Sequence, residues 1–447
     1  MVSSARLQPA PERPVVHPAL WIGALVAWLF IVHQICSAGF DHGKTSWCWM
    51  LASIAMLFVV QRVARRFRGL PGGEAAVLTA GLIALSAQVF VHGQGYLECS
   101  KTPNKGANDV GLNTHAAGTA FLDGKNPYSV RAQLWHTVKP GPHATVVEGQ
   151  TRLYGLEYDY GFPYFPAMFL TYLPFRVFAE GVQSIRIGTA FCVCLNAVLI
   201  AWLATALTKR RAGWLPGVLG AVAYLGIRSL VFEYFIEATT DVLVCTYGLL
   251  GFTVWQLGRP FVAGLFFGLA QASKLMPGPL FVLPLALSSG RGDATRRLIA
   301  GYVLGSCVVV LPWFAANPAT FISSTLLFYA NVHGDGDSTA IWFHLPRVLK
   351  RVVSVLQIVG TGGIVFLALK LRGEDRKDAL WPITLSYAAF MFFTCTAPMS
   401  HLNYLWTDYG LACLALVVHL ARGSEAGAAA DATGAAEAPS PLPAQDP

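Results

Sequence analysis

The chain has 447 residues, of which 54% are hydrophobic and only 13% are charged, and its mean hydropathy is +0.51. Soluble domains carry about 25% charged residues, so this composition excludes an ordinary soluble enzyme and indicates a polytopic membrane protein. The net charge of +8 does not indicate nucleic acid as a partner, because Arg and Lys cluster in short loops at 62–69, 208–211, 290–297 and 370–377. Such clusters are typical of the cytoplasmic loops of membrane proteins.

The chain begins with a polar, Pro-rich segment, 1–18, which we expect to be cytoplasmic and not a cleavable signal sequence. Apolar runs then predict an all-α transmembrane bundle of about 12 spans within a single domain, 19–422. The expected helices lie near 19–38, 46–61, 75–93, 184–207, 213–230, 239–257, 260–273, 276–289, 297–316, 351–371, 378–396 and 403–420. The Ala- and Pro-rich tail, 423–447, is predicted to be disordered and cytoplasmic.

The run FPYFPAMFLTYLPFRVF at 162–178 is apolar but short, and it contains three prolines. If every Arg-rich loop is cytoplasmic, only one crossing fits between the span at 75–93 and the basic loop at 208–211. The run at 184–207 is long enough for that crossing. We therefore expect 162–178 to lie along the outer membrane interface, with its aromatic side chains at headgroup depth, in a large external loop at 94–183 that bears interfacial helices.

Ionisable side chains gather on the external side of this predicted topology. They are Asp109, His115, Asp123, Glu157 and Asp159 in the loop 94–183, Glu233, Glu237 and Asp241 in a shorter loop, His333, Asp335, Asp337 and His344 in another, Lys274 at the LMPGP hairpin turn, and His401 at the end of a late span. An ionisable group at the middle of a span costs about 2.5–3.5 kcal/mol. The asymmetry predicts a functional site at the outer surface.

The polar stretch DVGLNTHAAGTAFLDGKNPYS, residues 109–129, suggests the chemistry of this site. A carboxylate just outside a membrane helix can deprotonate a hydroxyl group that approaches from outside the cytoplasm. Phosphate is a good leaving group, so a glycosyl phosphate needs one base and no acid. A cation near the leaving phosphate would stabilise its charge, and Lys274 is the candidate on the same side.

The order of Asp109, LDGKNPYS, YFPAMFL and GLAQASKLMPGP resembles the GT-C superfamily of polyprenyl-phosphate-sugar glycosyltransferases, and most closely the bacterial α-1,2-mannosyltransferase-like membrane enzymes. The resemblance covers roughly residues 75–420. It implies a mannosyltransferase with Asp109 as general base and with His401, in SHLNYLW, as a second functional residue. The implied partners are a polyprenyl-phosphate-sugar donor, a glycolipid or glycan acceptor in the cell envelope, and membrane lipid.

Each candidate has a structural alternative. Asp109 could instead cap a helix, Tyr128 could line a sugar pocket or anchor its turn, and Lys274 could bind phosphate or extend to the interface. His401 could bind phosphate, assist the base, or cap a helix. Glu157 and Asp159 could contact acceptor hydroxyls or only precede the interfacial helix. For Asp123, in a turn-forming sequence, we favour a structural role.

No metal or other cofactor is expected. The HGDGD run at 333–337 lacks a full set of ligand positions and is more typical of a solvated loop. The nine cysteines form no CxxC pair, and most lie in apolar runs, which predicts small buried hydrophobic residues and no disulfide framework. These are Cys192, Cys194, Cys245, Cys307 and Cys413.

Two other functions fit a chain of this kind. A transporter or lipid-carrier flippase would also suit 12 spans, but it commonly shows an internal repeat with broken helices at matching positions, and no such repeat is visible. A non-catalytic scaffold for envelope synthesis is the third hypothesis. The favoured prediction is a multi-pass cell-membrane enzyme, with no nucleic-acid partner, whose active site faces the periplasm or exterior.

Overall fold

The computed structural model describes residues 107, 109–129, 144–147, 150–153, 161–208, 215–225, 237–274, 277–288, 292–327, 379–396, 407–419 and 422, with isolated positions between 352 and 370. The predicted spans before residue 94, both terminal segments, the HGDGD run, Glu157, Asp159 and His401 lie outside these residues.

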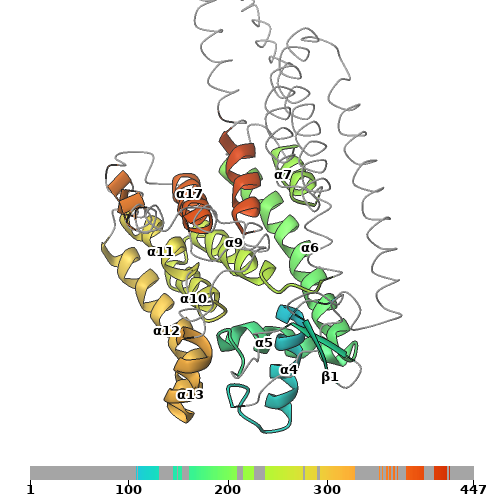
Figure 1. The fold of residues 1–447 in the computed structure, drawn as a ribbon. Coiled ribbons are helices and arrows are strands. Elements are labelled where there is room, and N and C mark those ends of the chain that lie inside the picture. Colours follow the sequence, from blue (N-terminus) through green and yellow to red (C-terminus); the bar gives the residue numbers. More distant parts are fainter. Residues whose placement is uncertain are drawn as a thin grey trace, which may run out of the picture.

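The described part of the chain is helical (Figure 1). Its helices are α4 (Asp109–Leu122), α5 (Pro166–Tyr172), the 3-10 helix η1 (Leu173–Val177), α6 (Val182–Leu207), α7 (Leu215–Leu225), α9 (Val242–Gln256), α10 (Pro260–Gln271), α11 (Pro277–Ser288), α12 (Gly292–Ala316), α13 (Pro318–Ile322), the π-helical η3 (Ser323–Leu327), α17 (Leu380–Thr396) and a helix at Thr407–His419.

One short hairpin interrupts the all-α prediction. Strands β1 (Ala144–Val147) and β2 (Gln150–Leu153) pair antiparallel, with Val147 opposite Gln150. The β-branched residues of ATVV and the Thr of QTRL suit a strand, whereas no helical period runs through this part of the predicted external loop. The prediction of a loop that bears interfacial helices did not include this hairpin.

Two helices are long and apolar enough to cross a membrane. They are α6, with 26 residues, and α12, with 25, and at 1.5 Å per residue each measures about 37–39 Å, which exceeds a hydrocarbon core of about 30 Å. The other apolar helices among the described residues have 10–17 residues each. By length and composition, the described part of the chain therefore holds two candidate spans, and the predicted number of about 12 stays a prediction.

Helix α12 begins five residues before the predicted start of its span, at Gly292. Asp293 lies in its first turn, where the helix dipole stabilises a carboxylate, and it forms an ion pair with Arg297 at 3.0 Å. These polar turns extend the helix beyond its apolar part. Farther along, α12 presents large exposed apolar side chains: Ile299, Val303, Leu304, Val308, Leu311 and Phe314. Such a surface suits contact with lipid.

The cysteines of the described residues are all free, and their burial differs from the prediction at two positions. Cys192, Cys245 and Cys413 are buried, as predicted, whereas Cys194 is exposed and Cys307 is half-buried. Cys194 is two residues from Cys192 on α6, about 200° around the helix, so the two cannot share a buried face.

Helices α10 and α12 pack through glycine. Gly264 and Gly268 of α10 face Gly301 and Gly305 of α12, so both helices carry the small-xxx-small spacing that lets helix backbones approach closely in membranes. A Cβ atom on Gly268 would lie 2.5 Å from the Tyr302 carbonyl oxygen. Because that neighbour is backbone, the contact cannot be relieved by a side-chain rotation. This packing fixes the position of α10, and hence of the residues that follow it.

We expect Gly268→Ala to destabilise the protein, since the added methyl group must separate α10 from α12. Overpacking of this kind costs about 1–3 kcal/mol. Thermal unfolding in detergent measures the effect, with Gly292→Ala as the matched control, because nothing lies within 4 Å of a Cβ atom built there. Equal melting temperatures for the two variants would contradict the close packing.

Candidate functional site

The predicted base, Asp109, is the first residue of helix α4. The sequence analysis placed Asp109 in the loop 94–183, with a helix cap as the alternative, and in the structure α4 begins at this residue. A Cβ atom on Gly111, in the same turn, would lie 2.6 Å from the Ala238 carbonyl oxygen and 2.8 Å from the Ala238 Cβ. Glycine at this position therefore lets the first turn of α4 pack against the segment that leads into α9.

A buried ion pair joins that segment to the turn after α10. Asp241 directly precedes α9, Lys274 follows α10, and their side chains form a salt bridge. The Lys274 side chain is 13% exposed and that of Asp241 only 3%. The ammonium group also lies 5.6 Å from the centre of the Tyr164 ring, within the range of a cation–π contact. The lysine predicted at an outer hairpin turn is thus enclosed by protein.

The segment around Tyr164 is hydrogen-bonded to the same turn. The Phe165 amide donates to the Ser273 carbonyl at 3.3 Å, and the Ala167 amide donates to the Ala272 carbonyl at 2.8 Å. These bonds hold the start of α5 over the α10–α11 connection. Figure 1 shows α4 and α5 together at one end of the helix bundle.

The aromatic side chains of 162–178 mostly face the protein and not the lipid headgroups. Those of Phe162, Tyr164, Phe165, Phe169 and Tyr172 are at most 9% exposed. These five side chains pack within the protein, because helices α4, α6 and α13 offer them apolar partners, and the placement of the segment at headgroup depth stays a prediction. Phe178, which is 72% exposed, does point outward.

Tyr128 anchors this arrangement from the Asn126-Pro127-Tyr128 turn. Its ring is 1% exposed, and its hydroxyl group donates to the Tyr164 carbonyl oxygen at 3.0 Å. Burial raises the pKa of the phenol well above its ordinary value of 10, so the hydroxyl keeps its proton. The Asn126 carboxamide oxygen accepts from the Tyr128 amide at 3.0 Å and closes the turn.

Around Tyr128 lies an aromatic junction, which we define as Tyr128, Phe162, Phe165, Phe169, Trp313 and Phe321. Phe321 of α13 lies 4.7 Å from Tyr128 and is stacked at 5.8 Å on Phe165, measured between ring centres. Ser324 adds a polar link, since its hydroxyl oxygen accepts from the Gly161 amide at 3.1 Å. The junction joins the turn after α4 and the α5 segment to α12, through Trp313, and to α13, through Phe321.

The helix at Thr407–His419 begins beside the first turns of α9. A Cβ atom on Gly410 would lie 2.6 Å from the Cys245 sulfur. Asp408 in the same turn is 2% exposed. His401 precedes Thr407 by six residues, which an extended chain spans in about 20 Å. His401 itself lies outside the described residues.

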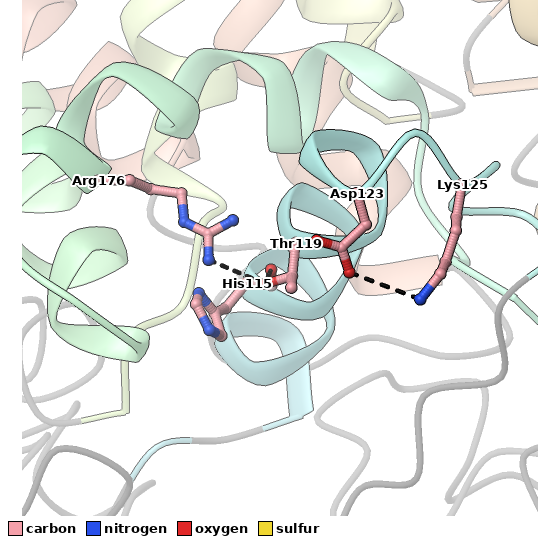
Figure 2. Close-up of polar contacts among 5 residues, drawn as sticks. All are labelled: His115, Thr119, Asp123, Lys125 and Arg176. Atoms are coloured by element: carbon pink, nitrogen blue, oxygen red, sulfur yellow. Dashed lines mark hydrogen bonds and ion pairs between the residues drawn. The ribbon is translucent and has the colours of Figure 1, made fainter.

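A second polar cluster lies on the α4 face that meets η1 (Figure 2). Arg176 of η1 donates from Nη2 to the Thr119 hydroxyl oxygen at 2.9 Å, and the Thr119 hydroxyl donates to the His115 carbonyl at 3.1 Å. Burial, and then the charge of Arg176, lower the pKa of His115 from 6.5 to about 4. The imidazole is therefore neutral at pH 7.

Asp123 lies on another side of α4. Its carboxylate is directed to Lys125 at 3.6 Å, away from Arg176 (Figure 2), and both side chains are more than half exposed. Gly124, between them, has φ +71, a conformation that glycine adopts without strain. This geometry agrees with a structural turn role for Asp123.

The structure thus joins Lys274 to Asp241 and, through Tyr164, to the Tyr128 turn, and it packs the first turn of α4 against Ala238, three residues before Asp241. The sequence analysis missed three residues, Arg176, Arg186 and Asp408. It named Asp241 but did not predict its salt bridge with Lys274. Arg186 is 0% exposed in α6 and donates to Gln183 at 3.1 Å. A charged residue inside a predicted apolar run was the available signal for Arg186 and Asp408.

No group of three or more His, Cys, Asp or Glu side chains that could hold a metal ion occurs within the described ranges. Two groups of polar side chains in that part of the chain could bind an anionic substrate. They are the Lys274–Asp241 pair and the cluster of Arg176, Thr119 and His115. A cation paired with a carboxylate beside a helix N-terminus can orient an anionic group and a hydroxyl group next to each other.

Comparison with known proteins adds the family. The model of glycosyltransferase family 87 matches residues 162–396, more than half of the chain. The match includes Asp241 and Lys274 and excludes Asp109, Tyr128 and His401. No curated protein and no solved structure matches the chain significantly. The chain belongs to glycosyltransferase family 87, and the protein is a membrane glycosyltransferase.

Proposed function

We propose that the enzyme transfers a hexose, most plausibly mannose, from a polyprenyl-phosphate donor to a lipid-linked or polymeric envelope glycan. The reaction takes place at the end of the bundle where α4 meets the Lys274–Asp241 pair, and in this proposal that end faces the periplasm or exterior. The observation that carries the proposal is the contact between Gly111 and Ala238, because it sets the helix that begins with Asp109 against the segment that holds Asp241.

The proposed chemistry uses one base. Asp109 accepts the proton of the acceptor hydroxyl group as its oxygen bonds to the anomeric carbon. The bond between that carbon and the phosphate oxygen breaks, and the phosphate leaves with the electron pair. Attack opposite the phosphate inverts the anomeric centre, so a β-linked donor gives an α-linked product. No step requires a metal ion or other cofactor.

Lys274 holds the donor phosphate in this proposal, and Asp241 fixes its position. Burial supports the role, because a charge of low exposure acts through a weaker dielectric screen than a surface charge. The ion pair also offers a structural alternative, since a buried carboxylate needs a partner whether or not a substrate is bound. Removing both charges of the pair separates the phosphate-binding role of Lys274 from its structural role.

The remaining predicted residues take secondary roles. His401 assists at the phosphate or the base, a role supported by its short distance along the chain from the helix beside α9. Glu157 and Asp159 contact acceptor hydroxyl groups. Tyr128 acts as a positioning residue through the Tyr164 carbonyl group, because its own ring is buried.

We expect Asp109→Asn to lower turnover by about 10²–10⁴-fold, since the amide keeps the size of the side chain but cannot accept the proton. Donor binding should survive. Rates of sugar transfer, measured with purified enzyme and a polyprenyl-phosphate sugar, check the effect.

The matched control for that measurement is Asp123→Asn, which changes an exposed carboxylate just after the C-terminal end of the same helix. It should retain most of the activity. Near-normal turnover in Asp109→Asn would refute the proposed base and direct attention to Glu157, Asp159 or His401.

We expect Lys274→Met to weaken donor binding, since a charge-assisted hydrogen bond to phosphate contributes about 1.5–3 kcal/mol. The same variant leaves Asp241 buried without this cation, which destabilises a folded protein by about 3–5 kcal/mol. Stability and donor affinity must therefore be measured together, by thermal unfolding and by equilibrium binding of the donor.

The double variant Lys274→Met, Asp241→Asn resolves the two effects, because it removes both charges. If Lys274 holds the phosphate, stability recovers in the double variant while donor affinity stays low. If donor affinity returns with stability, Lys274 has only a structural role and the phosphate-binding assignment is wrong.

A further inference from the structure

Arg176 has no counter-charge among the described residues. It forms no salt bridge there, its Nη1 atom is buried without a hydrogen-bond partner, and the residue as a whole is half-buried. The nearest acidic residue after α4, Asp123, is directed to Lys125 instead (Figure 2). A guanidinium group so placed is stabilised by an anion, because its charge is partly withdrawn from water.

On the side that faces α4, the guanidinium group of Arg176 lies beside polar atoms of His115 and Thr119. The His115 Nδ1 atom is also buried without a partner, and the imidazole is close enough to Arg176 for that charge to lower its pKa. Thr119 fixes the guanidinium through Nη2. Gly118 lies beside the guanidinium group, since a Cβ atom there would be 3.6 Å from Nη1, an ordinary van der Waals distance. Two unsatisfied nitrogen atoms and a hydroxyl group therefore meet between α4 and η1.

The outer side of the same element is apolar and exposed. Val177, next to Arg176, is 85% exposed, and Phe178 is 72% exposed. Phe191 of α6 is 55% exposed and lies 5.6 Å from Phe175, between ring centres. A fixed cation beside exposed apolar side chains matches a molecule that joins an anionic head to a hydrocarbon chain.

We propose that Arg176, positioned by Thr119, binds the phosphate group of a membrane lipid together with His115, and that the lipid chain lies against Val177 and Phe178. This site is separate from the Lys274 site. Gly111, near Asp241, and Thr119, near Arg176, are eight residues apart on α4, which corresponds to about 12 Å along the helix. The phosphate comes from an anionic phospholipid or from a polyprenyl phosphate, and the inference does not depend on the transfer reaction.

The test is native mass spectrometry of the full-length protein released from detergent, titrated separately with phosphatidylglycerol, polyprenyl phosphate, and a diacylglycerol of the same chains. Diacylglycerol lacks the phosphate and reports binding by the hydrocarbon alone. The variants are Arg176→Gln and Arg176→Lys, with Lys125→Gln as the matched control, since Lys125 is a nearby exposed cation that follows the same helix.

We expect Arg176→Gln to bind the phosphate-bearing lipid about tenfold or more weakly, and Arg176→Lys to keep part of the affinity. Lys125→Gln and diacylglycerol binding should not change. A loss confined to phosphatidylglycerol identifies a phospholipid, and a loss confined to polyprenyl phosphate identifies the carrier lipid. Equal affinities in wild type and Arg176→Gln for both lipids, in protein with an unchanged melting temperature, would overturn the proposal.

Discussion

The buried ion pair between Lys274 and Asp241 is the constraint on which the candidate site depends. Two charges of such low exposure are tolerated only where packing holds them together, since removing either partner leaves a buried charge. The pair therefore requires the start of α9 and the turn after α10 to stay in contact. Glycine packing between α10 and α12 fixes one side of that contact, and the hydrogen bonds from the α5 segment cover it.

Helix α4 is fitted to this centre by backbone contacts. Gly111 allows its first turn to reach Ala238, and the buried Tyr128 turn holds its far end against Tyr164. The first turn of the helix thus lies against the segment that leads to Asp241, and the face with Thr119 lies against Arg176. One short helix therefore lies between the proposed transfer site and the proposed lipid site.

Much of the helical architecture was predictable, because apolar runs directly determine α6, α9, α10, α11 and α17. The ends of elements were less predictable. Helix α12 starts five residues before its predicted apolar run, in a turn that holds the Asp293–Arg297 pair, and α4 starts within the predicted loop 94–183. The sequence analysis expected Lys274 and the 162–178 segment on the same side, and the structure joins that segment to the turn before Lys274 by hydrogen bonds. Its pairing with Asp241 was not predictable, because 33 residues and a helix hairpin separate the two in sequence. The inward packing of the aromatic side chains was missed because a headgroup region and a protein interface favour the same residue types.

The central claim is that a polyprenyl phosphate carries the sugar to this site. The most direct measurement offers the purified enzyme a panel of radiolabelled polyprenyl-phosphate hexoses and the matching nucleotide sugars, with an envelope glycolipid fraction as acceptor. The account predicts transfer from a polyprenyl-phosphate hexose, with mannose favoured and the anomeric configuration inverted in the product. Transfer from a nucleotide sugar alone, or retention of the anomeric configuration, would contradict it.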